Sequence, residues 1–319
     1  MLNIVFMGTP DFAKDSLEAI YNEGHNIMAI LTKEDKQQGR GMKLVETPVK
    51  KFAIEKGIPV YQPAKIRNNT EIINMLKQLN PDVICVVAYG KILPKEILEI
   101  PKLGCINVHG SLLPKYRGAA PIQWSVINGD KITGITTMYM DENMDTGDII
   151  LKQELEIGED ETTGELWDKL STIGGTLLVE TLKQIENGTA PRTKQQGEFS
   201  IAPMLEKEIS KIDWNNQTSK QIKDLTRGLN PIMGTYSMLN NKKIKFWKIQ
   251  IPKAEEIIFE FDNNSVPGTI IYSNEKQGLF IKTIDGLIKV LEIQGENAKR
   301  MPIGDFLRGN KLNIGEKFE

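Results

Sequence analysis

Apolar segments of strand length alternate with helical segments through the first part of this chain. The apolar segments are Leu2–Met7, Asn26–Leu31, Asp82–Tyr89 and Cys105–Val108, and a helix is predicted over Asp11–Asn22. Short, mostly apolar runs bounded by turn residues are typical of strands buried on both faces of a parallel sheet. The alternation therefore predicts an α/β fold, a Rossmann-like domain with a mostly parallel sheet.

The pattern changes in the last third of the chain. Thr162 and Glu165 form a capping box for one more long helix, after which residues 189–206 lack periodicity and contain several Pro and Gly. We expect a first domain of residues 1–188, a linker of residues 189–206 and a second domain of residues 207–319. Short, frequent strands in the second domain predict a small β-barrel: Thr235–Leu239, Lys242–Ile251, Gly268–Ser273, Gly278–Thr283 and Leu287–Ile293.

Histidine occurs only twice in the 319 residues, at His25 and His109. His109 ends a predicted strand, and Asn107 shares its face because side chains alternate along a strand. Ligands of open parallel sheets bind beyond the carboxyl ends of the strands, so this pair is expected at a binding site. The alternative is a hydrogen-bonded core histidine beside a turn-forming Asn. His25 is predicted to be a solvent-exposed loop residue.

Several other classes of site are disfavoured. The first loop, Gly8-Thr9-Pro10, is not the G-x-G-x-x-G sequence of a dinucleotide site. The acidic loop that contains Asp145 lacks the Glu that a calcium loop places at its twelfth position, and Cys85 and Cys105 lie in apolar runs where cysteine acts as a small hydrophobe. We therefore expect no metal ion and no nicotinamide or flavin cofactor.

Two long motifs resemble the 10-formyltetrahydrofolate-dependent formyltransferases. They are NVHGSLLPKYRGAAPIQW, which begins at Asn107, and GITTMYMDENMDTGDII, which begins at Gly134. The resemblance implies that Asn107 and His109 flank the transferred formyl group and that Asp145 is the catalytic aspartate. It also implies that 10-formyltetrahydrofolate is the formyl donor and contacts the loop of Ser111, Leu112, Leu113 and Pro114.

Further segments resemble the branch of this family that acts on transfer RNA. They are GTPDFA at residues 8–13, RGLNP at residues 227–231 and KRMPIGDFLRG at residues 299–309, the last two from an oligonucleotide-binding-like (OB-like) barrel domain. The resemblance implies formyl transfer to the amino group of methionyl initiator tRNA, for translation initiation. With no apolar run of membrane-spanning length and no basic leader at the N-terminus, we expect a cytoplasmic protein without membrane contact. We also expect a monomer, although no sequence pattern determines the oligomeric state.

Two basic regions are candidates for binding the tRNA. The polar stretch of residues 32–46 contains Arg40 and Lys43, and in the resemblance it is the loop that enters the acceptor end; the alternative is a plain surface loop. Residues 207–319 carry 18 Lys and Arg against 14 Asp and Glu, although the whole chain has a net charge of −2. Lys243 and Lys245 lie there beside Trp247 and are placed to follow phosphates. The alternative is that edge-strand lysines prevent aggregation.

Other functions within and outside the enzyme class stay open at the level of the sequence. A formyltransferase acting on glycinamide ribonucleotide would need a glycine-rich phosphate loop after the first strand, which GTPDF is not, and a sugar-amine enzyme shares the same core residues. A formyltetrahydrofolate hydrolase would not need the basic second domain. An inactive RNA-binding module would not need Asn107, His109 and Asp145.

Overall fold

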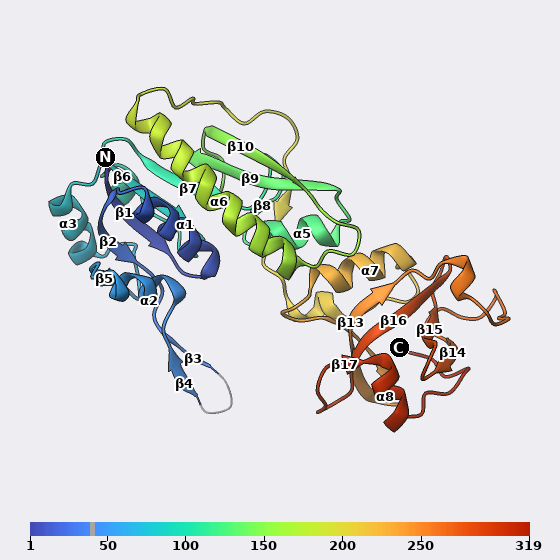
Figure 1. Ribbon diagram of the computed structural model, residues 1–319. Coiled ribbons are helices and arrows are strands. Elements are labelled where there is room, and N and C mark those ends of the chain that lie inside the picture. Colours follow the sequence, from blue (N-terminus) through green and yellow to red (C-terminus); the bar gives the residue numbers. More distant parts are fainter. Residues whose placement is uncertain (39–41) are drawn as a thin grey trace. The chain divides into compact units, whose positions relative to one another are not determined.

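The computed structural model describes residues 1–38 and 42–319, and its chain divides into two compact units (Figure 1). The first unit consists of Met1–Pro121, Ile132–Glu156 and Trp167–Pro203. The second consists of Ile122–Lys131, Ile157–Leu166 and Met204–Glu319. The functional division expected at residues 188 and 207 stays a prediction.

The first unit is built on a seven-stranded sheet in the order β10-β9-β7-β6-β1-β2-β5. The five strands from β7 to β5 are parallel, whereas β9 runs antiparallel to β7 and β10 antiparallel to β9. The mostly parallel, Rossmann-like sheet is therefore confirmed. The strands are β1 (Asn3–Gly8), β2 (Asn26–Leu31), β5 (Val60–Tyr61), β6 (Val83–Val87), β7 (Cys105–His109), β9 (Ile132–Tyr139) and β10 (Ile149–Glu156).

Helices cover both faces of this sheet because alternate side chains of each strand point to opposite faces. Val5 and Met7 pack in a core cluster with residues of α3 (Thr70–Leu79) and α4 (Lys95–Leu98). On the other face α1 (Asp11–Asn22) meets α6 (Thr163–Glu186), where the rings of Phe12 and Trp167 lie 5.3 Å apart. The remaining helix of the described part of this sheet domain is α2 (Pro48–Glu55).

The capping box predicted for α6 is present. The backbone N–H of Glu165 donates to Oγ1 of Thr162 at 3.3 Å, and the backbone N–H of Thr162 donates to Oε2 of Glu165 at 2.8 Å. Across the described residues, no helix combines the length and the apolarity needed to cross a membrane.

Both cysteines lie in the sheet, as expected from their apolar runs. Cys85 and Cys105 are buried, and burial raises the pKa of the Cys105 thiol to about 12. Burial likewise raises the pKa of the Cys85 thiol. Both side chains therefore remain protonated and act as packing groups.

Two local expectations for the first unit are wrong. Residues 32–46, expected to be irregular, contain a hairpin of β3 (Lys36–Gln38) and β4 (Lys43–Val45), which extends away from the sheet (Figure 1). Among the described residues, these two strands form a separate two-stranded sheet, so they need no apolar periodicity. His25 is buried, not solvent-exposed, and its Nδ1 accepts a hydrogen bond of 3.2 Å from the backbone N–H of Leu2.

The second unit contains an antiparallel sheet in the order β12-β13-β16-β15-β14, with β17 paired to β16. The five predicted strand runs are all present. Trp214, Phe246 and Phe318 pack ring against ring in its core. The more specific OB-like assignment stays a prediction. The strands are β12 (Thr235–Leu239), β13 (Lys242–Gln250), β14 (Ile270–Asn274), β15 (Gly278–Lys282), β16 (Leu287–Gln294) and β17 (Met301–Pro302).

Helical segments of the second unit are short. They are α7 (Ser219–Gly228), α8 (Ile303–Gly309) and the 3₁₀ turns η1 (Lys207–Ser210) and η2 (Ala254–Glu256), while α5 (Pro121–Ile127) begins in the first unit. Thr218 caps α7 by accepting a hydrogen bond of 3.1 Å from the backbone N–H of Gln221, whose side chain bonds back to the N–H of Thr218.

Candidate active site

Three predicted residues meet at the carboxyl end of β7. Asn107 and His109 project from one face of that strand, and Asp145 comes from the loop between β9 and β10. Nδ2 of Asn107 lies 3.5 Å from Oδ1 of Asp145, and Nδ1 of His109 lies 3.7 Å from Oδ2. His109 is 5% exposed, so the group is sheltered from water. An amide, an imidazole and a carboxylate therefore share one small site.

The second ring nitrogen of His109 has a partner of its own. Nε2 lies 2.8 Å from the backbone carbonyl oxygen of Tyr116. Since a carbonyl oxygen only accepts hydrogen bonds, Nε2 carries a proton. The other ring nitrogen, Nδ1, faces Oδ2 of Asp145 at 3.7 Å, beyond hydrogen-bond distance. Tyr116 has a φ of 60°, a left-handed conformation that a bulky residue rarely adopts.

Asp145 is held by backbone as well as by side chains. The N–H of Gly118 donates to Oδ2 of Asp145 at 2.8 Å. Gly118 belongs to the short strand β8 (Arg117–Gly118), which pairs with β11 (Ile201–Ala202). Its φ is 125°, and a Cβ there would lie 2.6 Å from the carbonyl oxygen of Ala202. Only glycine therefore lets the N–H reach the carboxylate. In the sequence, the Arg117-Gly118 pair of the first motif is the feature that could have indicated this role.

The loop after His109 divides into anchoring and accessible residues. Ser111 and Leu113 are fully buried, and Leu113 packs in a small cluster with Met138 and Ile149. The backbone N–H of Leu113 also donates to Oγ1 of Thr136 at 3.1 Å. Leu112 and Pro114 are only partly buried. Of the four predicted folate contacts, these two present side-chain surface to a ligand.

The predicted tRNA-binding residues lie elsewhere in the chain. Arg40 lies outside the described residues, and Lys43 begins β4. In the second unit, Nζ of Lys243 lies 3.6 Å from the ring centroid of Tyr236. Nζ of Lys245 donates to the carbonyl oxygen of Met233 at 2.9 Å, and burial together with the charge of Lys243 lowers the pKa of Lys245. Lys243 is therefore the more accessible of the two cations.

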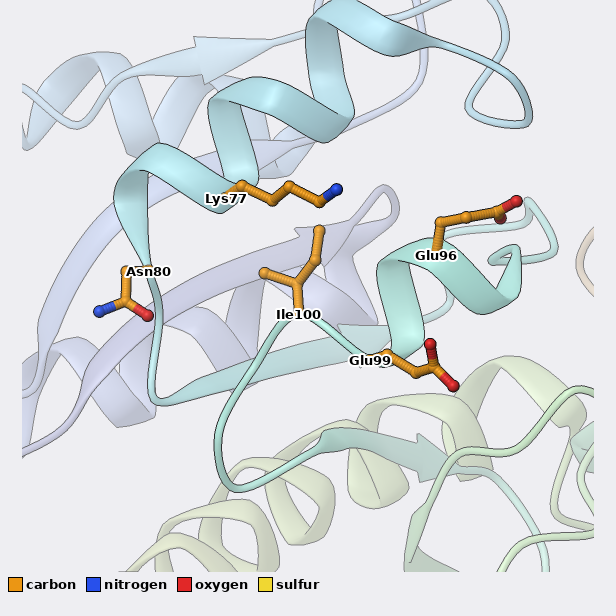
Figure 2. A pocket seen from close by; sticks show the side chains of 5 residues that line it. All are labelled: Lys77, Asn80, Glu96, Glu99 and Ile100. Atoms are coloured by element: carbon orange, nitrogen blue, oxygen red, sulfur yellow. The ribbon is translucent and has the colours of Figure 1, made fainter.

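A cavity of about 450 Å³ lies apart from this site (Figure 2). Asn80 and Ile100 line it and precede β6 and β7, so it opens at the amino ends of the strands, opposite the ends that carry His109. Its other lining side chains are two carboxylates and one amine: Glu96, Glu99 and Lys77.

Within residues 1–38 and 42–319, no three His, Cys, Asp or Glu side chains gather as a metal site requires.

The fold and this site agree with the comparison to known families. The formyl transferase family matches residues 2–182, and the C-terminal domain of formyl transferases matches residues 204–311. The chain therefore belongs to the formyl transferase family, as its two motifs indicated. The solved N-formyltransferase of Helicobacter canadensis, in complex with folinic acid and dTDP-3-aminofucose, has a similar fold, with a TM-score of 0.64 at 21% identity over 93% of this chain and 100% of that one.

Closer relatives narrow the family. The methionyl-tRNA formyltransferase of Clostridioides difficile (strain 630) is 51% identical over 315 residues, which is 98% of this chain and 99% of the relative. That of Ruminiclostridium cellulolyticum is 48% identical over 319 residues, 99% of both chains. Within the formyl transferases, the chain thus belongs to the methionyl-tRNA formyltransferases.

Proposed function

We propose that the protein transfers the formyl group of 10-formyltetrahydrofolate to the amino group of methionyl initiator tRNA. The observation that carries the proposal is the meeting of Asn107, His109 and Asp145 at the carboxyl end of β7. A chain of this family with that group intact has the hydrogen-bond donors and the base that acyl transfer needs.

The reaction is acyl transfer to a neutral amine. The amine nitrogen bonds to the formyl carbon, the carbonyl oxygen becomes an oxyanion, and the bond from that carbon to N10 of the folate then breaks. The side-chain amide of Asn107 has two hydrogens. One is directed at Asp145, and the other donates to the oxyanion. Such a donor contributes on the order of 3 kcal/mol to transition-state stability. His109 is the second donor, and its Nε2 proton must exchange from the Tyr116 carbonyl to the oxyanion.

Proton transfer falls to Asp145. The attacking amine loses a proton as the new bond forms, and the leaving N10 gains one, so protons balance over the cycle. Asp145 accepts the first of these through a water molecule and orients the imidazole of His109 while doing so. The N–H of Gly118, at 2.8 Å from Oδ2, keeps the carboxylate facing the site. The substrate amine is itself the nucleophile, so the mechanism requires no serine or cysteine nucleophile.

The substrates occupy different parts of the chain in this proposal. The folate lies against Leu112 and Pro114, beside the reacting group, and the loop around Arg40 and Lys43 positions the acceptor end. The second domain, residues 207–319, is an OB-like barrel. Its β13 lysines bind tRNA phosphates. The linker of residues 189–206, of which Thr193 and β11 pair with the first unit, joins this domain to the catalytic domain of residues 1–188. The enzyme is monomeric and cytoplasmic in this proposal.

A formylation assay tests the proposal. Purified protein is given 10-formyltetrahydrofolate with methionyl initiator tRNA, methionyl elongator tRNA or an amino sugar nucleotide. We expect formylation of the initiator at a rate far above that of the other two acceptors. Turnover of the folate with water alone, or equal formylation of a sugar amine, would overturn the assignment.

A further inference from the structure

The segment after α6 runs back along both sides of the Asp145 loop. Thr193 and Ile149 exchange two backbone hydrogen bonds of 2.8 and 3.0 Å, and β11 pairs in parallel with β8. The lack of periodicity in this segment predicts a linker. In the structure, residues 193–202 are fixed on the first unit at each end.

Gln195 lies between these two attachments and makes four hydrogen bonds. Its Nε2 donates to the backbone carbonyl oxygens of Asp145, at 2.8 Å, and Gly147, at 3.0 Å. Its Oε1 accepts from Nε and Nη2 of Arg117 at 3.1 and 2.7 Å. Both amide hydrogens and the amide oxygen are thus used, and the amide cannot rotate without reversing every donor and acceptor.

The loop that Gln195 holds is tightly constrained. Asp145 has a φ of 55°, a left-handed conformation that costs free energy in a non-glycine residue. A Cβ on Gly147 would lie 1.7 Å from the carbonyl oxygen of Tyr139, so the loop is pressed against β9. The carbonyls of Asp145 and Gly147 converge on one donor group. Without that group, two partial negative charges would face each other unpaired.

We propose that Gln195 is a positioning residue for the reaction: it fixes the backbone of Asp145 and thereby places the carboxylate between Asn107 and His109. The carboxylate oxygens lie 3.5 Å from Nδ2 of Asn107, at the limit of a hydrogen bond, and 3.7 Å from Nδ1 of His109, just beyond it. A shift of about 1 Å in the loop therefore breaks the group. This inference rests on the proposed formyl transfer.

A second contact from the same segment supports this role. Oγ of Ser200 accepts the backbone N–H of Tyr116 at 2.9 Å, and the carbonyl of Tyr116 is the partner of His109 Nε2. Residues 195 and 200 therefore hold the two sides of the site independently, one through Asp145 and one through His109. The segment is part of the active-site architecture.

The test replaces Gln195 by Met, which has a similar length and no donor. The matched control is Gln184→Met, because Gln184 is a partly buried amide of α6, as Gln195 is partly buried in its own segment, and donates to Glu180 at 2.9 Å away from the site. We expect Gln195→Met to lower kcat by roughly 10- to 100-fold, with KM for both substrates within about twofold and a modest fall in Tm, because two carbonyl oxygens lose their donor. We expect the control to match the parent. In an Asp145→Asn background, Gln195→Met should cost little more, because residues that act as one unit are not additive.

Hydrogen exchange gives a readout that does not depend on turnover. The backbone amides of residues 144–148 should exchange faster in Gln195→Met than in the parent or in Gln184→Met. An unchanged kcat, an equal fold-loss with and without Asp145→Asn, or unchanged exchange in this loop overturns the inference. A parent protein that formylates no methionyl-tRNA overturns the proposed function, and the exchange measurement still judges the placement of the loop.

Discussion

Nδ1 of His109 and Oδ2 of Asp145 lie 3.7 Å apart, facing each other from a strand end and a loop that are distant in the sequence. This separation is longer than a strong hydrogen bond. Catalytic hydrogen bonds in free enzymes are often long and shorten when substrate binds. In the proposed mechanism, the pair closes on the reacting formyl group.

Removing either member of this pair should abolish most activity. We expect His109→Ala and Asp145→Asn each to lower kcat/KM by about 10³-fold or more, a size typical of residues that act together. The double variant should lose little beyond the worse single variant. Steady-state formylation of methionyl initiator tRNA by the three proteins measures this. Losses that multiply would show that the two side chains act independently.

Two leucines in the loop after His109 allow the effect of ligand contact to be measured separately from the effect of core packing. Leu113 is fully buried against Met138 and Ile149, so Leu113→Ala should lower the free energy of unfolding by about 2–5 kcal/mol through the cavity it leaves. Leu112 is partly exposed, so Leu112→Ala should weaken folate binding with a smaller loss of stability. Denaturant unfolding and folate titration compare the two variants. Unchanged folate affinity in Leu112→Ala would remove this side chain from the donor site.

How much of this molecule is readable from its sequence depends on the range of the interactions. The strand at Asn3–Gly8 and the helix at Asp11–Asn22 follow from local pattern, as do the five strands of the second unit. Asn107 and His109 share a face by strand alternation alone. The role of Gln195 is not readable, because it depends on a non-periodic segment returning to the Asp145 loop. The contact of His25 with the distant backbone N–H of Leu2 is likewise not readable from local pattern.

The two lysines of β13 should differ in effect. Lys243 is exposed, so Lys243→Ala should weaken binding of initiator and elongator tRNA alike and reduce the salt slope by about one unit. Lys245 donates to the carbonyl of Met233, so Lys245→Ala should also lower stability by about 1 kcal/mol. Binding measured at several salt concentrations and thermal unfolding separate these effects. If Lys243 and Lys245 are replaced together by Ala and the salt slope does not change, these lysines do not bind phosphates and serve only to protect the sheet edge from aggregation.

Arg40 offers a test of acceptor-end positioning. It is flanked by Gly39 and Gly41 in the sequence, and Arg40→Ala should reduce formylation of the initiator by roughly 100-fold if it positions the reacting end. Overall tRNA affinity should change much less than the rate. Lys36→Ala, on β3, is the control for general loss of charge. Intact formylation by Arg40→Ala would mean that Arg40 does not position the substrate.

His25 provides a prediction about stability and pH. Its Nδ1 accepts the N–H of Leu2, so the folded protein holds the unprotonated form. Burial lowers the pKa of His25 below its ordinary value of 6.5, the charge of the N-terminus adds to this, and Glu23 opposes it. The unfolded chain therefore binds the proton more readily. Stability from this residue is fully present above pH 6.5 and is lost as the pH falls from there through the lower, folded-state pKa.

His25→Asn tests this linkage because an Asn carbonyl oxygen can accept from the same N–H without titrating. We expect the free energy of unfolding of the parent to fall more steeply between pH 7.5 and pH 5.5 than that of the variant, with similar values for both proteins at pH 7.5. Carboxylates titrate in both proteins, so the difference between the two curves isolates His25. Denaturant unfolding at several pH values provides the measurement. Parallel curves would show that His25 is equally easy to protonate in the folded and unfolded states.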